Sequence, residues 1–129
     1  MILKLTILPK VYSICRLDHN AALPHWLARE EFFSVTRTNE ELSIVSEQHN
    51  NMNEETICSR NWKILKIEGP LDLSLIGLIA EVSGIFKDAG IPIFTLSTYD
   101  TDYILVKQED LKTGIRALES NGHEIVAAG

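Results

Sequence analysis

The chain has 129 residues, of which 45% are hydrophobic and 23% are charged, and its formal net charge is −6. A chain of this length folds as one compact domain or as two very small units that share a core. Lys and Arg do not cluster, and binding a phosphate backbone needs such a cluster, so we expect no nucleic-acid partner. No apolar stretch reaches the length of a membrane span, and the first residues lack the marks of a signal peptide. We therefore expect a cytoplasmic protein without a membrane partner.

The chain contains two cysteines, Cys15 and Cys58, which form no CxxC motif. Cys15 lies where a strand would face the core. In a cytoplasmic protein, two such cysteines are expected to be reduced thiols.

The first half of the chain is predicted to form mainly strands. Alternating apolar residues predict strands at 2–8, 11–17, 32–37 and 42–46. Between the second and third of these strands, Pro24 fits the first turn of a short helix. Residues 47–61 are polar and lack a clear period, which predicts a connector with about one helical turn at most.

The second half has a clearer pattern. Apolar residues at helical spacing predict a first helix that ends at Gly90. The predicted elements are a strand at 62–68, a helix at 75–89, a hairpin at 93–98 and 103–107, a helix at 110–120 and a strand at 123–127. This order, β-α-β-β-α-β, is that of a ferredoxin-like unit.

The two halves resemble each other. Residues 32–47 and 93–108 each predict a strand, a polar turn and a second strand, at an offset of 61 residues. Upstream, residues 12–17 resemble residues 62–67 at an offset of 50, so the linking segment is 11 residues longer in the second half. The first half therefore reads as a trimmed copy whose second helix is reduced or lost, with an extra strand at its start. We predict a degenerate unit at 1–61 and a complete unit at 62–129.

The second half resembles the ACT domain family of small-molecule regulatory modules. The resemblance rests on the turn into a helix at 69–77, the helix end at 89–93 and the hairpin at 97–106. The whole chain resembles small bacterial proteins of two tandem ACT-like units, which are similar to the ACT units of aspartate kinases and of the CASTOR arginine sensors. This resemblance implies an α+β fold of two tandem ferredoxin-like units with antiparallel sheets, the first one degenerate. It also implies that an amino acid binds at the seam between units or between subunits.

An amino acid needs donors for its carboxylate and acceptors for its ammonium group. The start of the helix near Ser74 supplies unpaired backbone N–H groups, and Gly77 leaves its backbone open to approach. Acidic side chains of the turns would accept hydrogen bonds from the ammonium group, Thr98 would add a hydroxyl, and the first copy would contribute three further polar residues. The candidate ligand-binding residues are Thr36, Thr38, Glu41, Asp72, Ser74, Leu75, Ile76, Gly77, Thr98, Tyr99, Asp100 and Asp102.

Each of these candidates has a structural alternative. Asp72 or Ser74 would serve as a helix N-cap, which contributes about 1 kcal/mol. Asp100 and Asp102 are ordinary residues for a hairpin turn, and Tyr99 would serve in packing.

Catalysis finds little support in the sequence. The four histidines lack metal-ligand spacing, and no nucleophile-elbow, Walker or Rossmann pattern occurs. We expect no metal, no cofactor and no enzymatic activity, and a role as a ligand-binding regulatory module that acts on a protein partner.

Two alternatives remain open at this stage. Unpaired sheet edges in the trimmed half favour pairing with a second chain, so we expect a homodimer, and the protein would then serve as a dimerisation scaffold with a vestigial pocket. The other alternative is a small enzyme, because ferredoxin-like folds also support catalysis.

Overall fold

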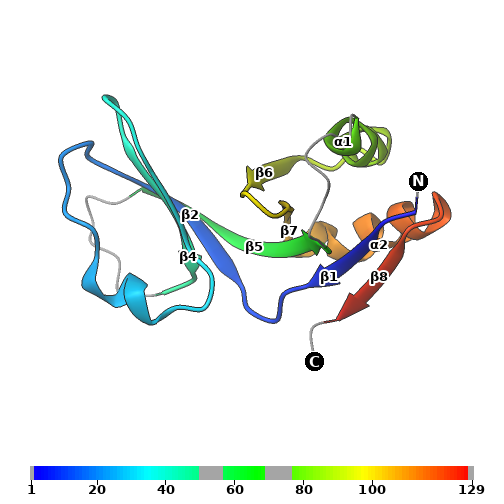
Figure 1. Cartoon of the computed structure of the whole chain (residues 1–129), viewed down its shortest axis with the longest axis horizontal. Helices are drawn as coiled ribbons and strands as arrows, with labels where there is room; N and C mark the ends of the chain where they lie inside the picture. The colour runs from blue at the N-terminus through cyan, green and yellow to red at the C-terminus, as the bar shows by residue number, and fades with distance from the viewer. Residues whose placement is uncertain (1, 50–56, 69–76, 128–129) are drawn as a thin grey trace. The chain divides into compact units, whose positions relative to one another are not determined.

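The computed structural model describes residues 2–49, 57–68 and 77–127 of the chain (Figure 1). The chain divides into a larger unit, Met1–Pro9 with Lys63–Gly129, and a smaller unit, Lys10–Trp62. None of the helices in the described part is both long and apolar enough to cross a lipid bilayer.

The larger unit is a sheet with two α-helices and has the predicted ferredoxin-like order. Its sheet places β6 next to β7, β7 next to β5, β5 next to β1, and β1 next to β8. The elements are β1 (Lys4–Ile7), β5 (Ile57–Ile67), α1 (Leu78–Asp88), β6 (Ile93–Ser97), β7 (Asp102–Lys107), the 3-10 helix η2 (Gln108–Asp110), α2 (Leu111–Ser120) and β8 (Glu124–Ala127).

The first strand of the chain belongs to the larger unit. β1 runs antiparallel to β5, with Leu5 opposite Ile67, and parallel to β8, with Lys4 opposite Glu124. The sequence placed this strand in a unit of residues 1–61, and that placement was wrong. The physical reason is that Leu3 and Leu5 are buried in the core of the larger unit, where β1 separates β5 from β8.

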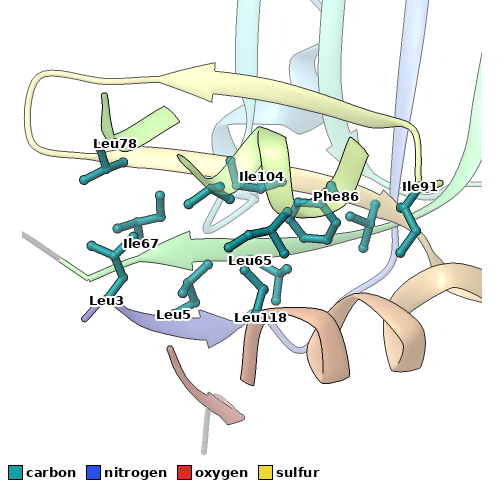
Figure 2. Packing of buried hydrophobic residues seen from close by; sticks show 12 residues of the cluster. Leu3, Leu5, Leu65, Ile67, Leu78, Phe86, Ile91, Ile104 and Leu118 are labelled. Carbon is teal, nitrogen blue, oxygen red and sulfur yellow. The ribbon is translucent and has the colours of Figure 1, made fainter. Parts of the chain in front are cut away.

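The core of the larger unit joins both helices to the sheet (Figure 2). Val82 and Phe86 lie four residues apart, so both fall on the buried face of α1. Leu118 contributes from α2, and Leu65 and Ile67 alternate on one face of β5. The buried members of this cluster are Leu3, Leu5, Leu65, Ile67, Leu78, Val82, Ile85, Phe86, Ile91, Ile104, Val106 and Leu118.

The smaller unit is the degenerate copy. Its sheet has the order β3-β4-β2-β5, and a 3-10 helix stands where a first α-helix would be. Its elements are β2 (Tyr12–Leu17), η1 (His25–Arg29), β3 (Ser34–Arg37), β4 (Leu42–Glu47) and the first part of β5. Its small core contains Leu27, Leu42 and Ile44. No α-helix occurs in residues 10–49 and 57–62, the described part of this unit, in which the sequence predicted a degenerate copy.

The predicted connector contains part of a strand. Residues 47–61 were expected to lack regular structure, but β4 ends at Glu47 and β5 begins at Ile57. This part of β5 alternates between exposed and half-buried side chains and carries few apolar residues, so its strand character was hidden in the sequence. The single helical turn considered for this connector falls largely outside the described residues.

Cys15 and Cys58 form a disulfide, so the expectation of two free thiols was wrong. The cysteines are partners in the antiparallel register of β2 and β5, and their Cα atoms are 4.1 Å apart. Cys15 is buried, as the sequence predicted. The sequence predicted this strand only from residue 62, so it did not show that Cys58 lies on β5 opposite Cys15.

Candidate functional site

The candidate site lies at the end of the larger unit where β5 ends and α1 begins. Ile67 of β5 and Leu78 of α1 share one core cluster, and Figure 2 shows them at the end of the sheet that carries the β6–β7 turn. β1 and β8 begin at this end as well, because Glu68 N donates to Lys4 O (2.8 Å) and Lys4 pairs with Glu124. Several elements thus bring their termini together here.

The backbone at the start of α1 offers donors. Gly77 precedes the helix in a left-handed conformation with φ of 84°, which glycine adopts without a Cβ clash. The first helical hydrogen bond runs from Glu81 N to Gly77 O (2.8 Å), so the N–H groups of Leu78, Ile79 and Ala80 have no partner within the helix. These groups and the helix dipole favour a negatively charged ligand group at this position.

The helix begins later than the sequence indicated. Gly77 was expected within the first turn, with Asp72 or Ser74 as the N-cap, but Gly77 itself is the N-cap residue. Its positive φ ends the helical conformation on the upstream side. Asp72, Ser74, Leu75 and Ile76 lie outside the described residues.

The β6–β7 turn is held by its own side chains. Thr98 N donates to Thr101 O (2.8 Å), and Thr101 N donates to Thr98 Oγ1 (3.3 Å). The buried hydroxyl of Thr101 donates to Ile67 O, which fastens the turn to the end of β5. At the edge of the turn, Ser97 Oγ donates to Asp102 Oδ1, so one carboxylate oxygen of Asp102 is engaged. Sequence reasoning identified Thr98 and Asp102 but missed Thr101.

Four further candidates, two in each unit, are exposed. Tyr99 is 84% exposed, so it does not pack in a core, and Asp100 next to it is exposed as well. Thr36 and Thr38 are exposed in the smaller unit.

His123 lies at the same end of the larger unit and was not among the predicted site residues. Its side chain is 0% exposed, and its Nδ1 accepts a hydrogen bond from Leu3 N (3.1 Å). Its Nε2 is buried and has no hydrogen-bond partner in the described part of the chain, and Glu81 Oε2 on the first turn of α1 is 3.8 Å away. The sequence offered no signal for this residue beyond its position between Gly122 and the last strand.

The smaller unit contains an equivalent turn. Thr38 N donates to Glu41 O (2.9 Å), as Thr98 N donates to Thr101 O. The strand registers therefore make Glu41 the counterpart of Thr101, whereas the sequence offset of 61 made it the counterpart of Asp102. That assignment was wrong by one residue, because sequence similarity alone does not fix a strand register.

Two arginines lie near this turn in the smaller unit, Arg37 at the end of β3 and Arg16 on β2. The guanidinium of Arg37 donates to the carbonyl oxygens of His19 and Ala21 in the β2–η1 loop. Arg16 lies 3.8 Å from the carboxylate of Glu41. The predicted partner residue Glu41 is thus already paired with a cation.

A second polar cluster lies in the smaller unit, outside the predicted site. The carboxylate of Glu30 is 6% exposed; it accepts a hydrogen bond from Glu47 N (2.7 Å) and lies 2.6 Å from His49 Nε2. The ring of His49 contacts Trp26, with centroids 4.5 Å apart. Burial, followed by the nearby carboxylates, raises the pKa of Tyr12 to about 12. Within residues 2–49, 57–68 and 77–127, no three His, Cys, Asp or Glu side chains form a group that could hold a metal ion.

Comparison with known proteins identifies the family. A family model described as an ACT domain matches residues 57–120, and a second model, described as an N-terminal domain, matches residues 10–54. A protein from Agobacterium tumefaciens with an X-ray structure is 32% identical; the match covers 100% of this chain and 96% of that chain, with a TM-score of 0.90. The chain belongs to the ACT domain family.

More distant structures share the fold of this ACT protein. A Vibrio cholerae protein of unknown function, described as a possible transport protein, is 21% identical; the match covers 92% of this chain and 88% of that chain, with a TM-score of 0.74. The ligand-free regulatory subunit of aspartate kinase from Thermus thermophilus is 10% identical, with coverages of 88% and 93% and a TM-score of 0.59. At these identities the likeness concerns the fold alone. The family resemblance and the two-unit α+β fold predicted from the sequence are confirmed.

The ACT domain model, which matches residues 57–120, covers only part of the larger unit. Residues 57–120 include the start of α1 and the β6–β7 turn, so they contain the main part of the candidate site. They leave out β1 and His123, which complete the same end of the larger unit. Those additions therefore lie outside the matched part of the ACT domain.

Proposed function

We propose that this ACT protein binds a free amino acid and acts as a regulatory sensor without catalysis of its own. The observation that carries the proposal is the start of α1, where the N–H groups of Leu78, Ile79 and Ala80 have no partner within the helix, in the same unit as the half-buried Asp102. The N–H groups suit a ligand carboxylate. Asp102 has one carboxylate oxygen engaged with Ser97 and a second oxygen that would accept from an ammonium group.

The predicted site residues enter this proposal with different roles. Thr98 would contribute its hydroxyl, although that hydroxyl already belongs to the turn. Asp72, Ser74, Leu75 and Ile76 precede Gly77 directly in the chain, so they are proposed as the segment that completes the site. Tyr99 and Asp100 are exposed on the turn and are proposed as its outer edge.

A regulatory role is supported by the fold neighbours. One of the similar structures is the regulatory subunit of aspartate kinase, a chain of which this fold covers 93%. A module without its own activity acts through a target, so we propose a protein partner, and we propose that the chain forms a homodimer.

The smaller unit is proposed to contribute structure more than ligand contacts. Arg37 and Arg16 already bind the carbonyl oxygens and the carboxylate that its turn and loop offer. Thr36, Thr38 and Glu41 therefore rank below the residues of the larger unit as ligand contacts.

Thermal unfolding in the presence of each of the twenty L-amino acids, at millimolar concentration, tests the proposal. A ligand at about 100 times its dissociation constant stabilises the native state by about 2.7 kcal/mol. For a chain of this size the unfolding midpoint then rises by several degrees. A rise confined to one or a few amino acids supports the sensor, and a flat response across the panel supports the scaffold alternative.

The variant Asp102→Asn assigns the site. It keeps the shape of the side chain and removes the charge that would hold an ammonium group, so we expect about tenfold weaker binding. Glu109→Gln, a matched change at an exposed position of η2, is the control and should bind as the wild type does. Equal affinity of the Asp102→Asn protein and the wild type would exclude Asp102 from the site.

A further inference from the structure

The hydrogen bonding of His123 fixes which ring nitrogen carries the proton. Leu3 N–H is a donor only, so the Nδ1 atom that it contacts at 3.1 Å must present its lone pair. The neutral ring therefore carries its proton on Nε2. In this arrangement Nε2–H donates a hydrogen bond and does not accept one.

This donor is buried and unsatisfied. Among the residues that the structure describes, none offers Nε2 a hydrogen bond, although the side chain is 0% exposed. Buried donors without partners are uncommon, and each one requires an explanation. The acceptor nearby is Glu81 Oε2 at 3.8 Å, which is beyond hydrogen-bond distance.

The position of Glu81 links this donor to the start of α1. Glu81 belongs to the first turn of the helix, and its side chain is 40% exposed. The 3.8 Å distance to Glu81 therefore places His123 Nε2 beside the first turn of α1, whose first N–H groups have no partner within the helix. The helix N–H groups and the His123 Nε2–H are all donors, so they suit an anionic oxygen group.

We propose that His123 Nε2–H donates a hydrogen bond to the carboxylate of the bound amino acid, and that Glu81 is an internal competitor for this donor. This inference rests on the proposed amino-acid binding at the start of α1. The carboxylate of Glu81 has the same chemistry as the ligand carboxylate and stays near the donor in the ligand-free protein. Binding then exchanges one carboxylate for another beside His123, which makes the position of the Glu81 side chain dependent on the ligand.

Two variants and a control test the inference by titration with each of the twenty L-amino acids. His123→Asn keeps an acceptor near the position of Nδ1 for Leu3 N–H and removes the Nε2–H donor. We expect about tenfold weaker binding or more, because hydrogen bonds to charged groups are strong. Glu81→Gln removes the competing charge at an exposed position, so we expect binding to become about threefold tighter or more. Asp88→Asn, at the far end of α1, should leave the affinity unchanged.

Nuclear magnetic resonance of the histidine rings supplies an independent readout. The buried Nε2–H of His123 should give a slowly exchanging proton signal that is absent from the His123→Asn protein. This signal should shift in Glu81→Gln and should shift again when a binding amino acid is added to the wild type. A merely structural His123 would show no shift on addition of the amino acid.

The outcomes separate this inference from the proposed function. If the wild type binds an amino acid but His123→Asn binds it equally well, or Glu81→Gln binds it more weakly, the inference is wrong and the proposed function stands. If the wild type binds none of the twenty amino acids, both are wrong. Tighter binding by Glu81→Gln together with weaker binding by a folded His123→Asn protein supports both.

Discussion

At the scale of single residues, Tyr12 makes the stability of the protein decrease at alkaline pH. Burial, followed by the carboxylates of Glu47, Glu30 and Glu31, raises the pKa of Tyr12 to about 12. The pKa of an unfolded tyrosine is about 10. Because the folded state holds the proton more tightly, the contribution of Tyr12 is fully present below pH of about 10 and is lost as the pH rises toward about 12.

The variant Tyr12→Phe should lose less stability over this pH range than the wild type. Phenylalanine keeps the edge-to-face contact with Phe32, whose ring centroid is 5.7 Å away, and has no proton to lose. Thermal unfolding between pH of about 9 and 12 measures the difference. Tyr99→Phe is the matched control, since Tyr99 is 84% exposed and its curve should follow that of the wild type. Identical curves for Tyr12→Phe and the wild type would contradict the assignment.

Two helical glycines offer a matched test of core packing. A Cβ at Gly114 would lie 2.8 Å from Cε1 of Phe86, a fully buried ring, whereas a Cβ at Gly84 would meet nothing within 4 Å. We expect Gly114→Ala to lower the free energy of unfolding by about 1–3 kcal/mol through overpacking. Gly84→Ala should raise it by about 0.5–1 kcal/mol, because alanine favours the helix. Urea unfolding measures both effects. Equal effects of the two variants would mean that α1 and α2 shift enough to accommodate a methyl group at position 114.

At the scale of elements, the disulfide ties β2 to β5 within the smaller unit. The two cysteines are 43 residues apart, and closing a loop of that length in the unfolded chain stabilises the folded state by roughly 4 kcal/mol in the chain-entropy account. Reduction should therefore lower the urea midpoint of the wild type and leave that of Cys58→Ala unchanged. The detection of two free thiols in the untreated protein would instead support the reduced state that the sequence suggested.

The elements that sequence reasoning predicted well are those with a local signal. The period of α1, its end at Gly90 with φ of 73°, and the hairpin of β6 and β7 all follow from residues close together in the chain. The part of β5 from Ile57 was missed because its side chains alternate between exposed and half-buried and its pairing partner β2 is distant in sequence. Long-range pairing decides such a strand, and composition does not.

In the candidate site, too, residues with a local sequence signal were predicted, and residues whose roles depend on distant contacts were not. Thr98 and Asp102 were predicted because turn residues have a local signature. Thr101 and His123 were missed because their roles arise from contacts with Ile67 and Leu3, which lie far away in the chain.

At the scale of the whole molecule, the larger unit depends on the N-terminus of the chain. β1 supplies the strand between β5 and β8, and Leu3 and Leu5 are buried in the core of this unit. Burying a leucine contributes about 1.5–3 kcal/mol, and the stability of a small domain is only about 5–15 kcal/mol. Without β1, β5 and β8 would also lose their shared hydrogen-bonding partner.

A fragment of residues 62–129, the unit that the sequence predicted, should therefore fail to fold cooperatively. We expect the fragment to lack a cooperative thermal transition by circular dichroism under conditions in which the full chain has one. Adding a synthetic peptide of residues 1–9 should restore a transition, because the peptide can pair with β5 and β8, whereas a peptide with Leu3 and Leu5 both changed to Ser should not. Since Leu3 N also bonds to His123, the peptide should restore amino-acid binding together with folding. A fragment that melts as the full chain does would show that β1 is dispensable and that the unit is complete from residue 62.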